Sequence, residues 1–262
     1  FRREMTFRRY IYVNLSWRHE YCGLLSMQLR GVTWYFVDNE RYFRRGSLYG
    51  AGDDGERFAF FCKAVIDLMP SLDWMPDILH CNDWQTALVP IYLKDVCTRW
   101  EAVRRIRTVF TIHNIEYQGR YGADTVDQLF GLDRGWYNDG TLQMDGDVNL
   151  MKGAMLVSDA VTTVSPTYAA QLHDAAYAEG MEGVVRMIDG KFSGVVNGLE
   201  RYDGNTIPHA HIVCESCGAV LDAERIELPE ELLTHVQQDT GCAIRRYQIS
   251  FTGVCPNCLQ KH

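Results

Sequence analysis

The stretch Pro76-Asp-Ile-Leu-His-Cys-Asn-Asp-Trp-Gln-Thr-Ala87 decides the fold class, because it passes from a short apolar run through a polar turn into a helical pattern. Ile78–His80 is typical of a strand and Asn82–Lys94 of a helix. The same alternation recurs over the first 200 residues and predicts an α/β fold, a Rossmann-like and mostly parallel sheet covered by helices. Such sheets bind ligands at the carboxyl ends of their strands, so residues directly after strands are candidate site residues.

Working outward, the remaining elements follow the same two periodicities. The other predicted strands are Tyr10–Val13, Thr33–Val37, Val109–His113, Ala160–Val164 and Gly194–Val196, and the other predicted helices are Asp54–Met69, Val148–Ser158 and Pro166–His173.

After Glu200 the pattern changes. His209–Val213 and Ala243–Phe251 alternate as strands, and Pro229–Gln238 has helical spacing with a proline in its first turn. We therefore predict two domains, 1–199 and 200–262, of which the second is a small α+β unit. About 60 residues bury little apolar surface, so a bound metal is the expected source of its stability.

Composition limits the functions to consider. The net charge is −8, and 5 basic and 9 acidic residues from Glu200 onward leave −4 on each domain. This charge argues against a nucleic-acid or anionic-membrane surface. No apolar run approaches the ~20 residues of a membrane span. Single cysteines among apolar residues and paired ones near the C-terminus favour a reducing, cytoplasmic location. Because Phe1 stands within a strand-like pattern, we expect a truncated start.

Polar residues follow three of the predicted strands. His80, Asn82 and Asp83 follow the first, His113 and Asn114 the second, and Asn197-Gly198 the third. By residue type alone, capping of the next helix is favoured about two to one for Asn82 or Asp83. A single histidine at a strand end is more often structural, and Asn-Gly is by default a turn.

From Thr6 to Leu199 the chain nevertheless resembles the N-terminal domain of bacterial glycogen (starch) synthase. The resemblance rests on the order of Trp17-Arg18, Leu48-Tyr49-Gly50, Glu56-Arg57-Phe58, His80-x-Asn82-Asp83-Trp84-Gln85-Thr86, Thr111-x-His113-Asn114, Asp145-Gly-Asp147, Lys152-Gly153, Val164-Ser-Pro-Thr-Tyr168 and Asn197-Gly198.

The resemblance implies a retaining glucosyltransferase of the glycosyltransferase-B type, which moves glucose from ADP-glucose to the 4-hydroxyl of an α-1,4-glucan. By the same resemblance, catalysis would fall to His113, Asp83 and Asn197. His113 would hydrogen-bond the hydroxyls of the transferred sugar and help to stabilise an oxocarbenium-like transition state. No cofactor is expected for the transfer. The implied substrate-binding residues are Tyr49, His80, Asn82 and Asn114.

The sequence also departs from that family. The Lys-Thr-Gly-Gly-Leu loop that holds the donor phosphates and the entire C-terminal lobe are missing. A cleft with one wall neither excludes water nor orients the donor. We therefore expect no turnover from these 262 residues alone.

Two Cys-x2-Cys pairs, Cys214 with Cys217 and Cys255 with Cys258, are the strongest chemical signal. Four thiolates close a tetrahedral, structural Zn²⁺ site. Unmetallated thiols or two disulfides are the alternatives. A second candidate metal site consists of Asp203, His209, His211 and Asp222. Two imidazoles and two carboxylates suit Fe²⁺, Mn²⁺ or Zn²⁺. The alternative is that the two histidines are a solvated pair on an exposed strand, which is as frequent.

From Arg201 to His262 this spacing resembles the C-terminal dimerisation domain of the ferric uptake regulator family, closest to peroxide-responsive repressors. The resemblance implies structural zinc on the cysteines, a regulatory ion on an incomplete second site, and a homodimer. The DNA-binding domain of that family is missing, so nucleic acid is not an expected partner. Three readings stay open: a glycosyltransferase, a metal-binding regulator fragment, or a fusion of two truncated genes without a selected function.

Overall fold

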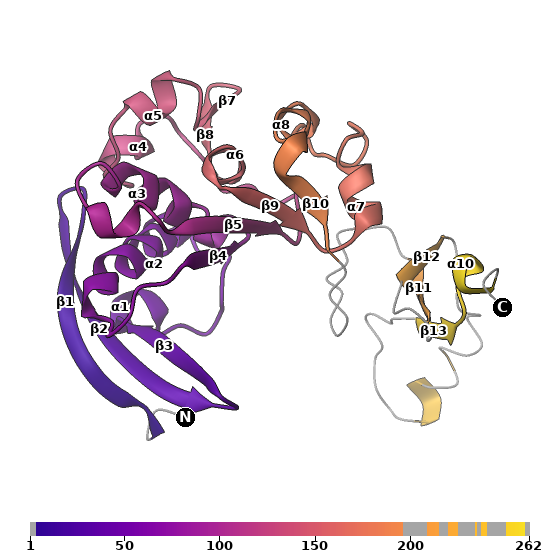
Figure 1. Cartoon of the computed structure of the whole chain (residues 1–262), viewed down its shortest axis with the longest axis horizontal. Coiled ribbons are helices and arrows are strands. Elements are labelled where there is room, and N and C mark those ends of the chain that lie inside the picture. The colour runs from indigo at the N-terminus through magenta and orange to yellow at the C-terminus, as the bar shows by residue number, and fades with distance from the viewer. Residues whose placement is uncertain are drawn as a thin grey trace. The chain divides into compact units, whose positions relative to one another are not determined.

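The computed structural model (Figure 1) describes residues 4–195, 209–214, 220–224, 234, 237–239 and 250–259. The chain folds into two compact units, Phe1–Val195 and Val196–His262. Residues 196–208 lie outside the described part, so the boundary at 199/200 stays a prediction.

A four-stranded parallel sheet in the order β10-β9-β5-β4 forms the centre of the first unit (Figure 1). Its strands are β4 (Ile78–Asn82), β5 (Arg107–Ile112), β9 (Ala160–Thr163) and β10 (Phe192–Gly194). The register places His80 beside Val109 and Thr111 beside Thr162. The prediction of a parallel sheet is confirmed. Strand β10 begins two residues before the predicted strand Gly194–Val196. Residue 196 of that predicted strand lies outside the described part.

The two faces of this sheet differ. Phe110, Ile112 and Val161 are completely buried on one face, which is the face that the connecting helices cover. Successive parallel strands joined by right-handed crossovers in one direction place all their helices on the same side. The opposite face carries His80, Thr111 and Thr162, because side chains alternate along a strand.

The predicted helices are present with small shifts of their ends. They are α2 (Asp54–Leu68), α3 (Leu88–Val96), α6 (Leu150–Val157) and α7 (Pro166–Gln171). The polar start predicted for the helix after β4 is a separate 3₁₀ turn, η3 (Trp84–Thr86), and not part of α3. Helix α2 packs against α3, and α3 packs against α6.

The first strands do not join the parallel sheet, contrary to the prediction. Strands β1 (Thr6–Leu15), β2 (Arg18–Leu29) and β3 (Val32–Asp38) form a separate antiparallel sheet. Two-residue turns join them, and Arg30 and Gly31 both have positive φ, as a type I′ hairpin turn requires. Tight hairpins force antiparallel pairing, so the prediction that these strands belong to the strand–helix alternation of the parallel sheet is wrong. The inner side of this sheet packs on α2.

The remaining elements of the first unit are short. They are α1 (Glu40–Phe43), η2 (Met69–Ser71), η4 (Glu101–Val103), β6 (Arg120–Tyr121), α4 (Thr125–Gln128), α5 (Gly135–Asn138), β7 (Gln143–Met144), β8 (Asp147–Asn149), α8 (Glu182–Met187) and η5 (Asp189–Lys191).

The second unit contains a three-stranded sheet in the order β12-β11-β13, with β11 (His209–Cys214), β12 (Val220–Glu224) and β13 (Ser250–Gly253), followed by α10 (Pro256–Leu259). Strand β11 confirms the predicted strand His209–Val213. Of the predicted helix Pro229–Gln238, only residues 234, 237 and 238 are described, and they are helical. Of the predicted strand Ala243–Phe251, only its last two residues are described, and they belong to β13. Within the described residues, no helix is long and apolar enough to cross a membrane.

Candidate functional site

The carboxyl ends of β4 and β5 bring three predicted site residues together, and we call Asn82, Asp83 and His113 the strand-end group. The Asp83 Oδ1 atom accepts a hydrogen bond of 2.8 Å from the backbone N–H of His113. The His113 Nε2 atom lies 3.0 Å from Asn82 Oδ1. Because neighbouring parallel strands end at the same edge, residues 30 positions apart in the sequence meet here.

Asp83 has a strained backbone. Its φ is 56° and its ψ is 177°, a conformation that is costly for any residue other than glycine, at about 1–3 kcal/mol. Its carboxylate makes no capping bond to the turn that follows. The capping interpretation favoured by residue type is therefore wrong for Asp83, because its carboxylate bonds across to the next strand end. Strain that the surroundings enforce is a pointer to function.

Burial changes the acidity of two residues at this edge. The pKa of Asp83 is raised by burial, although the hydrogen bond from the His113 backbone and the nearby imidazole oppose the shift. The pKa of His80 is lowered by partial burial and then by the charge of His113. His80 is therefore mostly neutral at pH 7. One nitrogen of a neutral imidazole donates a hydrogen bond and the other accepts one.

A polar row crosses the face of the sheet that carries His80, next to the strand-end group. The His80 Nε2 atom lies 2.6 Å from Thr111 Oγ1, which lies 2.6 Å from Thr162 Oγ1. The predictions did not include Thr162 and used Thr111 only as a motif residue. The signal that could have found them is a threonine next to the end of each central strand, facing the same side as His80.

The other predicted substrate-binding residues are placed differently. Asn114 uses its side-chain oxygen to accept from the backbone N–H of Glu116, at 2.9 Å, so it shapes the turn after β5. Tyr49 lies in the loop before α2, with 64% of its surface exposed. Asn197 lies outside the described residues.

Other motif residues have structural roles. Trp84 packs edge-on against Phe58 of α2, with ring centroids 5.2 Å apart. Asp145 and Gly146 both have positive φ and form the turn between β7 and β8. Ser165 caps α7 by accepting from the backbone N–H of Tyr168, at 3.0 Å.

In the second unit, three of the four predicted zinc ligands converge. The Sγ atoms of Cys214, Cys255 and Cys258 all lie within 4.8 Å of one another. Cys214 ends β11 opposite Gly253, the last residue of β13, so Cys255 follows at the same end of the sheet. The Cys255 N–H donates to Cys214 Sγ at 3.2 Å.

The rest of the predicted metal set is described only in part. Cys217 and Asp203 lie outside the described residues. Positions 211 and 222, a histidine and an aspartate, are direct partners across β11 and β12, and position 209 pairs with position 224.

A parallel α/β lobe with polar residues gathered at its strand ends belongs to the class of folds that bind ligands at that edge of the sheet. The fold is shared with the catalytic domain of starch synthase IV from Arabidopsis thaliana, whose structure was solved with ADP and acarbose bound. The two agree with a TM-score of 0.69 at 23% identity, over 98% of this chain and 59% of that one.

The family model described as the starch synthase catalytic domain matches residues 1–187. The chain belongs to this family. It is 48% identical over 194 residues to the glycogen synthase of Lactococcus lactis subsp. lactis, covering 74% of this chain and 40% of the relative. It is 41% identical over 210 residues to the glycogen synthase of Lactobacillus acidophilus, covering 79% and 44%.

The chain therefore spans about two fifths of the length of these curated relatives. The family match ends at residue 187 and does not reach the cysteine pairs. The resemblance of the tail to the regulator family, and the idea of a gene fusion, stay predictions.

Proposed function

We propose that the first unit is the part of an ADP-glucose-dependent α-glucan glucosyltransferase that holds the glucosyl group during transfer. The observation that carries this proposal is the strand-end group, in which a strained aspartate, an asparagine and a histidine are joined by hydrogen bonds at the ligand-binding edge of the sheet. Membership of the starch synthase family supports the substrate class.

The proposed chemistry uses these residues as fixed polar groups. The imidazole of His113 hydrogen-bonds hydroxyls of the sugar, and Asn82 holds that ring in place. The carboxylate of Asp83 faces positive charge as it develops on the sugar, where preorganised groups are most effective. Asn197 is proposed for the same pocket, and His80 and Asn114 for its rim. The chain needs no metal for this step in our proposal.

Ligand binding by the chain itself tests this proposal, because the chain contains the strand-end group that is proposed to contact the ligand. We expect maltohexaose or ADP-glucose to bind the wild-type chain in a calorimetric titration. His113→Ala should raise the dissociation constant about tenfold, the equivalent of one hydrogen bond to a polar ligand. The matched control is His173→Ala, which removes a histidine whose side chain is 37% exposed beside Asp189, outside the strand-end group. Equal affinities for wild type and His113→Ala, or no binding of either ligand, would contradict the proposal.

We also propose that the second unit holds a structural zinc ion, an independent function that the thiol cluster favours. Zn–S bonds of about 2.3 Å place the sulfurs of a tetrahedral site about 4 Å apart. The three described Sγ atoms all lie within 4.8 Å of one another, which is compatible with such a site. Cys217 is the proposed fourth ligand by its spacing from Cys214. A second site for Fe²⁺, Mn²⁺ or Zn²⁺ on Asp203, His209, His211 and Asp222 is a finer proposal that rests on the residue types of this set and on the resemblance. Dimerisation through this unit is a proposal that rests on the resemblance.

Metal analysis of the purified chain tests the zinc proposal. We expect about one zinc per chain after dialysis, and a zinc content near zero for Cys255→Ser. Cys97→Ser is the matched control, because Cys97 is a half-exposed thiol of the first unit. A Cys255→Ser chain that keeps its zinc would overturn the assignment, as would a wild-type chain that takes up none during refolding with zinc.

A further inference from the structure

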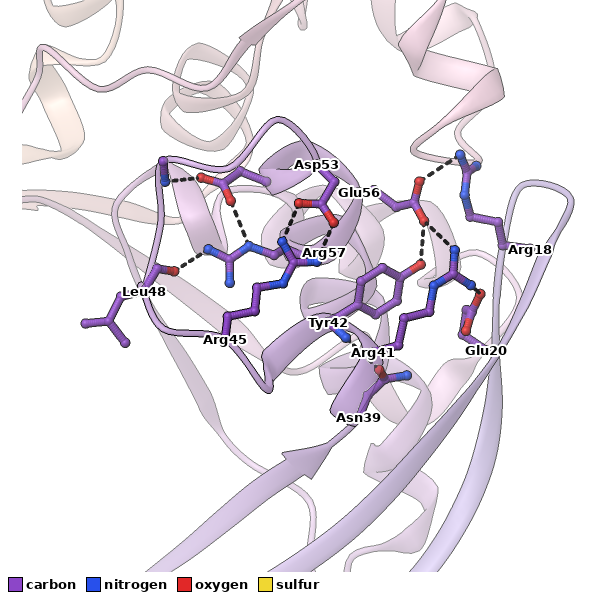
Figure 2. Close-up of polar contacts among 12 residues, drawn as sticks. Arg18, Glu20, Asn39, Arg41, Tyr42, Arg45, Leu48, Asp53, Glu56 and Arg57 are labelled. Atoms are coloured by element: carbon purple, nitrogen blue, oxygen red, sulfur yellow. Dashed lines mark hydrogen bonds and ion pairs between the residues drawn. The ribbon is translucent and has the colours of Figure 1, made fainter.

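Three motifs that are far apart in the sequence meet at the first turn of α2. Figure 2 shows that Arg18 of the β1–β2 hairpin pairs with Glu56 of α2. It also shows that Arg57 of α2 donates to the backbone carbonyl of Leu48 in the loop before α2. None of these residues belongs to the strand-end group. The hairpin, the loop and the helix are therefore held as one framework.

The centre of this framework is a buried ion pair. The Arg57 Nε atom donates to Asp54 Oδ1 at 2.7 Å, and the two residues are 3% and 8% exposed. Both partners also reach the loop: the second oxygen of Asp54 accepts from the backbone N–H of Gly50 at 2.6 Å, and Arg57 donates to the carbonyl oxygen of Leu48. A buried charge pair is tolerated when further hydrogen bonds satisfy it, and here the loop backbone supplies them.

Around this pair, a second set of ion pairs fixes the elements beside the loop (Figure 2). Glu56 contacts Arg18 at 2.9 Å and accepts from the Tyr42 hydroxyl of α1 at 2.6 Å. Arg45 and Asp53, near the two ends of the loop, form a two-point pair. The loop between α1 and α2 is therefore held near its ends by the Arg45–Asp53 pair and in its middle by the contacts to Leu48 and Gly50.

The clamped loop displays apolar side chains to solvent. Leu48 is 83% exposed and Tyr49 is 64% exposed. Tyr49 stands between the Leu48 carbonyl, which accepts from Arg57, and the Gly50 N–H, which donates to Asp54. Gly50 has a φ of 93°, which glycine adopts without strain. The buried charges hold the backbone on both sides of the exposed Tyr49. Burying charges for this purpose costs desolvation, and the packing of the core does not explain it.

The loop lies at the same edge as the strand-end group. A helix that leads into a parallel strand starts near the carboxyl end of the sheet, since it runs antiparallel to the strands. The contact between Phe58 in the first turns of α2 and Trp84, the residue after Asp83, confirms this placement. The guanidinium of Arg57 lies 4.4 Å from the centre of the Phe58 ring, which connects the ion pair to that contact.

We propose that Asp54 and Arg57 are positioning residues that hold the 48–50 loop rigid, so that the Tyr49 ring presents a flat surface to a pyranose ring of the glucan. This inference rests on the proposed function, because it takes the α-glucan as the ligand. Aromatic side chains with few rotatable bonds bind at a low entropic cost, provided that their backbone is already fixed.

Hydrogen exchange and glucan binding together test this inference. Arg57→Lys keeps the charge but removes the planar fork that reaches Asp54 and Leu48 at once. We expect the Gly50 amide to exchange at least tenfold faster and the dissociation constant for maltohexaose to rise about five- to tenfold. Arg134→Lys is the matched control, because it alters an exposed pair with Asp127 at 2.9 Å, and it should change neither quantity.

A second variant covers the case in which Arg57→Lys fails to fold. Gly50→Ala strains only the loop, because no atom lies within 4 Å of the added Cβ, and it should weaken maltohexaose binding with little change in the unfolding midpoint.

Tyr49→Ala separates the two proposals. If Tyr49→Ala binds like the wild type while His113→Ala is weakened, this inference fails and the proposed function stands. If Tyr49→Ala is weakened but Arg57→Lys and Gly50→Ala bind normally, the positioning role is wrong. If the wild type binds no glucan, the proposed function fails first.

Discussion

Arg57→Met is expected to lower the free energy of unfolding of the first unit by about 3–5 kcal/mol, because it leaves the Asp54 carboxylate buried without its counter-ion. Arg57 and Asp54 have side-chain exposures of only 4% and 11%, so solvent screens the pair weakly. Urea unfolding followed by tryptophan fluorescence measures this change. All six tryptophans lie between Trp17 and Trp136, so the signal reports only the first unit.

The double variant Arg57→Met, Asp54→Asn isolates the cause. A neutral asparagine at position 54 needs no counter-ion, so the double variant should recover much of the loss. The control Arg134→Met removes a cation whose pair with Asp127 is about half exposed, and it should cost about 0–1 kcal/mol. A loss in Arg57→Met no larger than that of Arg134→Met would show that the pair contributes little.

Gly194→Ala is the second change with a large expected effect. A Cβ at this position would lie 2.2 Å from the carbonyl oxygen of Ser165 and 2.4 Å from the nitrogen of Pro166. These are backbone atoms at the start of α7, so no side-chain rotation relieves the overlap. We expect a loss of about 3 kcal/mol or more, and a melting temperature lower by about 6–12 °C.

Gly190→Ala is the matched control for this prediction. It lies four residues away, and no atom is within 4 Å of its added Cβ, so its effect should stay within about 0.5 kcal/mol. Melting followed by circular dichroism compares the two variants. Equal melting temperatures for Gly194→Ala and the wild type would mean that α7 and β10 separate at little cost.

The elements of the parallel sheet were predictable because each has a local signal. Ile78, Val109 and Val161 lie in short β-rich runs that end in polar residues, and those runs are β4, β5 and β9. The separate sheet of β1, β2 and β3 was missed. Its turns are marked only by Ser16-Trp17 and Arg30-Gly31, and of these only glycine is a usual hairpin signal.

The candidate site was predictable as a set of residues but not as a geometry. The position of Asp83 and His113 after strands predicted that they would lie at one edge. That Asp83 bonds to the His113 backbone instead of capping a helix depends on how β4 and β5 align. A capping preference is local, and a contact across 30 residues overrides it.

The sequence by itself determined that Pro76–Ala87 passes from strand to helix with His80, Asn82 and Asp83 at the junction, because hydrophobic period and turn chemistry act over a few residues. Only the tertiary structure decided the strained backbone of Asp83, the polar row through Thr111 and Thr162, and the meeting of Arg18, Leu48 and Arg57. The physical reason is that strand register and buried charge pairing join residues far apart in the chain, and no local preference encodes those distances.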